Sequence, residues 1–163
     1  MICTKISLKT RFLAVILLIG VLFSATGCDI LNILYGPTIE DAKSYMFDGW
    51  EVQIPEGAKM NYYESCIGFP SDGGRYCVFT FEEEPTEFIA DFSYEESEEF
   101  KDEFNQFFGW LIADLEREGE TFNQDYAFNW EWEYCWKLVG DWDELFMLYR
   151  PETLQLYVLM NYM

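Results

Sequence analysis

The sequence predicts an α+β fold: an antiparallel sheet of about six strands with one long amphipathic helix packed on one face, preceded by a short N-terminal helix. Apolar residues recur at helical spacing between positions 100 and 115, whereas several other segments alternate apolar and polar residues with the period of a β-strand. The chain has 163 residues, of which 50% are hydrophobic and 20% aromatic, so it can build a hydrophobic core.

The part of the chain before the long helix predicts a short helix and three strands. The short helix is expected over residues 38–46, with Asp41 placed to complete a capping box. Residues 50–54 alternate apolar and polar side chains and are followed by a proline, so they predict the first strand. Two more strands are expected over 59–66 and 75–81.

The long helix is predicted to begin at Ser93, a good N-cap with Glu96 three residues later, and to end at Gly119. Its apolar stripe consists of Phe100, Phe104, Phe107, Phe108, Leu111 and Leu115. Acidic residues crowd the first turns, where they favour the positive end of the helix dipole. The stripe can therefore cover one face of the sheet.

Aromatic residues alternate along the segment after the helix and predict the fourth strand, over 126–138. The aromatic row consists of Tyr126, Phe128, Trp130, Trp132, Tyr134 and Trp136. Segments 144–150 and 154–162 predict the last two strands.

The aromatic row has two interpretations. As core, it packs against the phenylalanine stripe of the helix; as a site, it presents flat faces that stack on sugar rings. Core is favoured, because leaving even one such side chain exposed forgoes about 1.5–3 kcal/mol of burial. Trp50, Trp110 and Trp142 lie off these stripes, so they are the candidate ligand-contacting aromatics.

The start of the chain carries the features of an export signal. Three basic residues before position 12 precede an uncharged apolar run, Phe12 to Phe23, and the small residues Ala25 to Gly27 stand in front of Cys28. A cysteine directly after small residues resembles the lipobox of bacterial lipoproteins. The resemblance implies cleavage after Gly27 and a diacylglyceryl group on the Cys28 thiol.

This resemblance predicts the domain organisation and the location. Residues 1–27 are expected to be the signal peptide, 28–37 a lipidated tether and 38–163 a single α+β domain. The lipid would hold the protein on the extracytoplasmic face of the bacterial cell membrane. A secreted form and a retained membrane anchor are the alternatives, although the apolar run is short for a span, which needs about 20 residues.

Acidic residues outnumber basic residues by 30 to 10, which gives a net charge of −20. Cleavage after Gly27 would remove three of the ten basic residues and no acidic residue, leaving 7 against 30 and a net charge of −23. Such a charge argues against nucleic acid as a partner, because phosphates need lysine and arginine. It favours a basic protein or peptide, and solubility is the simpler alternative.

The chain contains no histidine, which excludes catalytic pairs of the Ser-His or Cys-His kind within it. Carboxylates are so abundant that a chance pair at glycosidase spacing carries no information. No spaced oxygen pattern predicts a calcium loop. We therefore expect no enzymatic activity, no metal site and no cofactor.

Three cysteines follow the lipobox: Cys66, Cys77 and Cys135. Cys66 and Cys77 flank a turn-rich segment, and a hairpin centred on Ser71 and Asp72 would place them opposite each other. We expect a disulfide there, worth on the order of 3 kcal/mol by the chain-entropy account, because an extracytoplasmic compartment is oxidising. Cys135 would then be a free, small, buried residue.

Together these features predict a lipid-anchored interaction domain, of the inhibitor, immunity or adaptor kind, that binds a basic protein or peptide through an acidic surface. The alternative is a lipoprotein that binds carbohydrate or cell-wall glycan through exposed aromatic residues. An enzyme that works with carboxylates alone ranks last. Ionic strength separates the first two, because salt screens charge-steered binding and hardly affects stacking on sugars.

Overall fold

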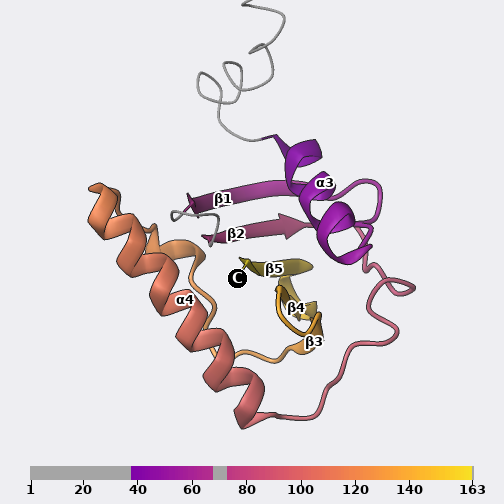
Figure 1. The fold of residues 1–163 in the computed structure, drawn as a ribbon. Helices are drawn as coiled ribbons and strands as arrows, with labels where there is room; N and C mark the ends of the chain where they lie inside the picture. Colours follow the sequence, from indigo (N-terminus) through magenta and orange to yellow (C-terminus); the bar gives the residue numbers. More distant parts are fainter. Residues whose placement is uncertain (1–37, 68–72, 163) are drawn as a thin grey trace, which may run out of the picture. The chain divides into compact units, whose positions relative to one another are not determined.

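Five antiparallel strands form one sheet in the computed structural model, which describes residues 38–67 and 73–162 (Figure 1). The strand order is β1-β2-β5-β4-β3, so the last strand of the chain lies in the middle. The elements in chain order are α3 (Ile39–Trp50), β1 (Lys59–Ile67), β2 (Gly73–Thr80), α4 (Glu98–Glu118), the 3₁₀ turn Gln124–Tyr126, β3 (Cys135–Val139), β4 (Glu144–Arg150), the 3₁₀ turn Pro151–Thr153 and β5 (Gln155–Tyr162). The predicted α+β class is confirmed, and the prediction of about six strands is wrong by one.

The predicted strand over 50–54 is absent, because α3 is longer than expected. The helix continues to Trp50 and ends on Glu51, whose φ of 56° lies in the left-handed region. Residues after Glu51 then run as a loop to β1. The alternation of apolar and polar residues in this segment therefore reflects one helical end and one buried loop residue, Ile54.

The predicted strand over 126–138 is extended only in its last part, β3. Asn129 interrupts the alternating row with a local turn. Its Oδ1 accepts a hydrogen bond from the Glu131 amide at 3.0 Å, and its carbonyl accepts one from the Trp132 amide at 3.1 Å. Side-chain hydrogen bonds of this kind compete with ladder hydrogen bonds, so the first half of the row forms a packed loop.

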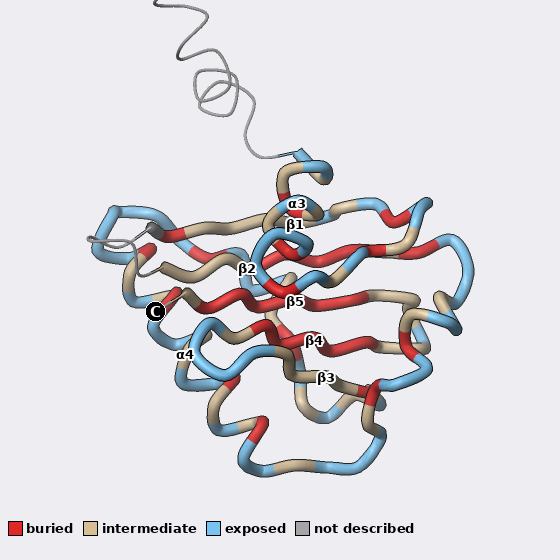
Figure 2. Tube along the Cα trace, turned by 45° about the vertical axis from the view of Figure 1, so that its right-hand side comes forward, coloured by how far each residue is buried: buried red, intermediate tan, exposed pale blue. Residues whose placement is uncertain are grey.

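The sheet is covered on both faces: β4 and β5 are buried along most of their length, and β2 is buried from Tyr76 to Phe79 (Figure 2). Successive residues of these strands alternate between two hydrophobic cores. The core on the α4 side includes Phe100, Phe104, Leu111, Leu115, Tyr76, Val78, Phe146, Leu148, Tyr157 and Leu159. The core on the α3 side includes Ala42, Met46, Trp50, Cys77, Phe79, Leu145, Met147, Tyr149, Leu156, Val158 and Met160. The sheet thus needs a cover on each side, and the long helix supplies only one of them.

The caps of the two helices agree with the sequence at two of four ends. Thr38 and Asp41 form the predicted capping box, in which the Thr38 amide donates to Asp41 Oδ2 at 2.7 Å. Gly119 ends α4 with a φ of 85°, also as predicted. The N-cap of α4 is Ser97 instead of Ser93, and its Oγ accepts a hydrogen bond from the Phe100 amide at 3.2 Å.

Ser93 cannot cap the helix because its backbone is paired with the edge of the sheet. Its amide donates to the Trp136 carbonyl at 2.8 Å, and its carbonyl accepts from the Trp136 amide at 2.9 Å. This isolated antiparallel bridge lies beside β3. It satisfies backbone groups that an edge strand would otherwise leave unpaired.

The register of the β1–β2 hairpin differs from the one that the disulfide requires. Cys66 lies opposite Gly74, and Cys77 lies opposite Tyr63. The two cysteines point into different cores, Cys66 on the α4 side and Cys77 on the α3 side. The predicted Cys66–Cys77 disulfide is therefore not formed, and both residues are free thiols, as is Cys135.

Burial keeps these thiols protonated. It raises the pKa of Cys66 and of Cys135 to about 11, and it raises the pKa of Cys77 further still. Cys66 donates a hydrogen bond from Sγ to Glu118 Oε1 at 3.3 Å, which also favours its neutral form. The thiolate is the reactive form, so burial disfavours reaction at all three thiols.

The predicted signal peptide 1–27, the tether 28–37 and the lipidation site Cys28 lie outside the described residues. Thr38, where the described chain begins, also opens the compact unit that runs to Met163. Neither described helix combines the length and the apolar character that crossing a membrane requires.

Peptide mapping tests the free thiols. Denaturing the full-length chain in alkylating reagent without reductant should alkylate Cys66, Cys77 and Cys135, because none of them is bonded. In the native chain Cys77 should react far more slowly than after denaturation, since it is fully buried. A recovered Cys66–Cys77 disulfide peptide would contradict the hairpin register.

Gly140→Ala should destabilise the domain more than Gly57→Ala does. Both glycines have a positive φ, 101° and 83°, so each substitution carries the same kind of backbone strain, about 1 kcal/mol. A Cβ on Gly140 would also lie 2.0 Å from the Asp143 carbonyl oxygen, whereas nothing lies within 4 Å of one on Gly57. Urea denaturation compares the two; equal midpoints would mean that the turn at Gly140 moves aside freely.

Candidate functional site

The structure separates the three tryptophans that the sequence singles out. Trp110 and Trp142 are exposed, at 52% and 80% of their surface, whereas Trp50 is 9% exposed. Trp50 is therefore not a ligand contact. It lies four residues after Met46 and eight after Ala42, on the buried face of α3. The predicted helix ended at residue 46, so the sequence did not place Trp50 on this face.

Trp50 instead holds two parts of the chain together. Its Nε1 donates a hydrogen bond to the Asp143 carbonyl at 2.7 Å, in the turn between β3 and β4. Its ring packs on Tyr162, the last residue of β5, with the ring centroids 5.0 Å apart. The turn that carries Trp142 is thereby fixed to the end of α3.

Trp110 stands on the outer face of α4 and is supported from one side only. Its ring meets Phe107 edge-on at a centroid distance of 5.0 Å, and Phe107 packs on Phe146 of β4 at 5.7 Å. Trp110 therefore rests on the core without entering it. An exposed indole with a fixed orientation can serve as an anchor for a partner.

A pair of carboxylates connects α4 with the turn that carries Trp142. Glu144, two residues after Trp142, interacts electrostatically with Glu103 of α4. Burial raises the pKa of Glu144, and the Glu103 charge raises it further. Glu144 Oε2 is buried without a hydrogen bond of standard geometry, although the Asn161 side chain, opposite it on β5, favours the charged form and partly offsets the rise in pKa. Among the described residues neither glutamate forms an ion pair with a lysine or arginine.

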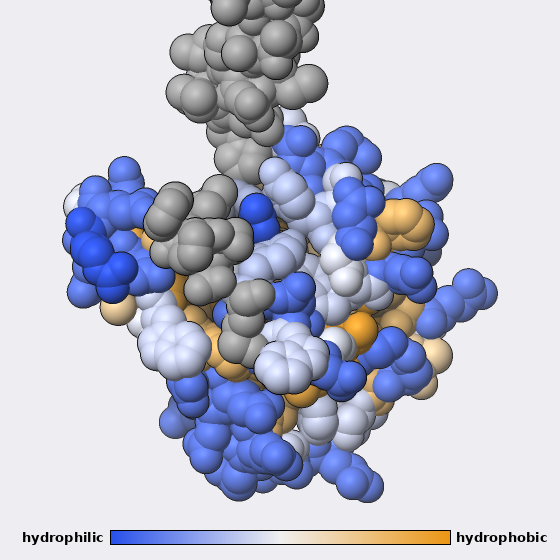
Figure 3. Space-filling view, in the orientation of Figure 1, coloured by the Kyte–Doolittle hydropathy of each residue, from blue (hydrophilic) through white to orange (hydrophobic). Residues whose placement is uncertain are grey.

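We call these four residues the Trp110–Trp142 surface: the two exposed tryptophans, Glu103 and Glu144. Two like charges held near each other, one of them partly desolvated, favour the approach of a cation. Exposed tryptophan faces attract lysine and arginine side chains as well. Figure 3 shows pale, ring-bearing side chains set within a largely hydrophilic surface. The surface is therefore suited chemically to a cationic, partly apolar partner.

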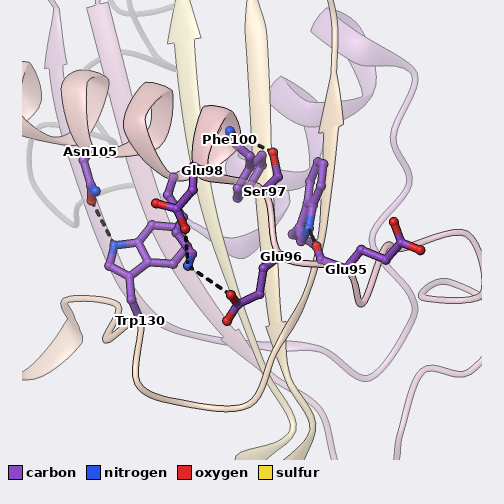
Figure 4. Close-up of polar contacts among 9 residues, drawn as sticks. Glu95, Glu96, Ser97, Glu98, Phe100, Asn105 and Trp130 are labelled. Atoms are coloured by element: carbon purple, nitrogen blue, oxygen red, sulfur yellow. Dashed lines mark hydrogen bonds and ion pairs between the residues drawn. The ribbon is translucent and has the colours of Figure 1, made fainter.

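Most basic residues of the described chain are already engaged close to where they stand. Lys101 binds Glu98 at 3.1 Å and Glu96 at 3.9 Å at the start of α4 (Figure 4). The other ion-paired bases are Lys43, Lys59, Arg117, Lys137 and Arg150. These local pairs neutralise few of the 30 acidic residues, so the negative field of the domain persists.

The aromatic row is mostly core, as favoured from the sequence. Phe128 is buried and the rest of the row is half-buried against the α4 core. Trp130 Nε1 donates to Asn105 Oδ1 at 3.0 Å, and Trp136 Nε1 donates to the Glu95 carbonyl at 2.7 Å (Figure 4). The Arg150 guanidinium lies 4.1 Å from the centroid of the Trp132 ring. These contacts leave no row of free, coplanar faces.

Sequence reasoning missed the Glu103–Glu144 pair. Glu103 belongs to a run of helix glutamates that reads as a solvated face, and Glu144 opens a strand, so nothing local links them. Within 38–67 and 73–162, no three acidic or cysteine side chains come together as metal ligands would.

The chain matches no protein-family model, no curated protein and no solved structure. Its function is accordingly argued from the geometry and chemistry of the described residues.

Glu144→Gln should stabilise the domain at neutral pH and not at acidic pH. A folded-state pKa above the ordinary value of 4.5 means that the folded chain holds this proton more tightly than the unfolded chain does. Stability is therefore lost as pH rises from that value through the folded pKa, and glutamine removes the loss. Melting curves on both sides of this range test it against Glu99→Gln, which removes an exposed charge from α4. A gain that is equal at both pH values would refute the desolvated carboxylate.

Proposed function

We propose that this chain is a lipid-anchored, extracytoplasmic interaction domain, of the inhibitor, immunity or adaptor kind, whose acidic surface binds a basic protein or peptide. The observation that carries the proposal is the electrostatic interaction of Glu103 with Glu144, which no cation of the described chain neutralises by an ion pair. Trp110 on α4 and Trp142 in the turn before Glu144 are exposed. A partner's lysine or arginine would supply that cation.

Binding of a cation at this surface would remove an unfavourable electrostatic interaction that is present in the free domain. A cation placed between Glu103 and Glu144 removes their mutual repulsion and gives the buried Glu144 oxygen a hydrogen-bond donor. The exposed indoles of Trp110 and Trp142 would contact the apolar stems of the partner's side chains. The net charge of −20 would steer a basic partner toward the domain from a distance.

The lipobox-like sequence around Cys28 supports membrane anchoring. The described domain begins at Thr38, so a lipid on Cys28 would keep the binding surface within a short tether of the bilayer. An anchored acidic domain in that place would intercept basic proteins close to the membrane that carries it.

Binding of a glycan ranks second. The aromatic row provides few free surfaces for a sugar ring. The Arg150 guanidinium covers the Trp132 ring, and the indole N–H groups of Trp130 and Trp136 already donate hydrogen bonds within the domain. Trp142, exposed in its turn, is the strongest remaining contact for a sugar ring. No observation favours an enzyme.

Binding of an oligolysine peptide to the full-length chain in detergent tests the proposal. We expect Trp110→Ala and Trp142→Ala each to weaken binding roughly tenfold, as loss of an anchor residue does. Tyr94→Ala is the matched control, because this tyrosine is also exposed, at 62%, and does not belong to the Trp110–Trp142 surface. Binding should also weaken steeply with added salt.

Charge-matched variants separate the surface from the overall field. The double change Glu103→Gln with Glu144→Gln should weaken binding much more than Glu98→Gln with Glu99→Gln, which removes the same charge from the start of α4. Equal effects would mean that net charge alone attracts the peptide and would contradict the proposed surface. Salt-independent binding of peptidoglycan fragments that requires Trp142 would instead favour the glycan alternative.

A further inference from the structure

A pocket of about 340 Å³ lies on the α3 side of the sheet, where β2 begins and β5 ends next to α3. Its lining consists of Tyr45, Asp48, Gly49, Cys66, Gly73, Arg75 and Tyr162. None of these residues belongs to the Trp110–Trp142 surface. The volume is at the small end of the range for ligand cavities, roughly 300–1,000 Å³, so a small molecule would fill it.

Arg75 is the distinctive residue of this pocket. Its guanidinium carbon lies 4.2 Å from the centroid of the Tyr45 ring and 4.7 Å from that of Tyr162. Within the described chain it is the one base without a carboxylate in ion-pair range. In a chain with three acidic residues for each basic one, a base held apart from carboxylates is unexpected.

The two tyrosine rings explain how Arg75 is held and what it offers. Both rings lie against the guanidinium, and the Tyr162 side chain also accepts a hydrogen bond from it. A guanidinium has five N–H groups, so donors remain for a carboxylate, which can accept two parallel hydrogen bonds. The pocket therefore offers a positioned cation for one carboxylate.

Asp48 supplies the opposite charge in the same pocket. It forms no ion pair with any described base, Arg75 included. Its Oδ2 accepts a hydrogen bond from Ser44 Oγ at 3.1 Å, which orients the carboxylate at the C-terminal half of α3. A single small pocket thus holds one cation and one anion that do not neutralise each other.

We propose that this pocket binds a free α-amino acid as its zwitterion, with the ligand carboxylate on Arg75 and the ligand ammonium on Asp48. A phosphate would be repelled by the Asp48 carboxylate and by the net negative charge of the chain. A simple cation would be repelled by Arg75. Tyr45 and Tyr162 provide apolar surface for the ligand's side chain.

Saturation-transfer NMR on the full-length chain in detergent, with the common amino acids in pools, tests the proposal. We expect at least one amino acid to receive saturation, and its methyl ester and its N-acetyl form each to bind at least roughly tenfold more weakly. Arg75→Gln and Asp48→Asn should abolish the signal, and Arg75→Lys should retain part of it. Arg117→Gln, an exposed arginine of α4, is the control and should bind normally.

Each remaining outcome overturns the proposal. These outcomes are the absence of saturation transfer to any amino acid in any pool, and binding of the N-acetyl form or of the methyl ester as tight as that of the free amino acid. Binding that is retained in both Arg75→Gln and Asp48→Asn is the last of them. Circular dichroism shows whether the variants are folded. Should Arg75→Gln fail to fold, Asp48→Asn decides alone, because Asp48 lies on the exposed face of α3 and carries no core contact.

Discussion

Burial of both faces of the central strands is the constraint on which the rest of this structure depends. β5 runs between β2 and β4 and is enclosed from both sides, so every side chain from Leu156 to Met160 lies in one core or the other. A sheet buried on one face needs one cover, whereas this one needs two. The long helix α4 provides one, and α3 provides the other together with the segments that follow it and that follow β2.

This double burial also explains which parts of the fold could be predicted from the sequence. The α4 stripe and its Gly119 stop depend on local chemistry, and so does the Thr38–Asp41 capping box; all were foreseeable. The hairpin register was not, because the composition of the turn allows several pairings and only the packing of Cys66 and Cys77 into separate cores selects one. The end of α3 was missed for a similar reason, since the partners of Trp50, Asp143 and Tyr162, lie far from it in the sequence.

Candidate site residues were predictable only where exposure follows from local position. Trp110 lies off a helical stripe and Trp142 lies in a turn, and each is exposed for that reason. The Glu103–Glu144 pair and the Arg75–Asp48 pocket join residues that are far apart in the chain. No local sequence spacing predicts that these residues come together. In both, the informative feature is a charge placed without its usual partner. Such a charge can be identified only when the structure shows which of the few basic residues form ion pairs and with which carboxylates.

The position of Trp50 has a consequence for how the two proposed sites relate. Its indole N–H is bound to the turn that carries Trp142, and its ring rests on Tyr162, which forms one wall of the Arg75 pocket. One rigid side chain is therefore a neighbour of both. A partner that shifts the Trp142 turn on binding would also shift Tyr162 through Trp50 and so change the affinity of the Arg75 pocket. Thermodynamic linkage then requires a ligand in the pocket to change the affinity for the partner by the same factor. Trp50 makes the two sites candidates for energetic coupling.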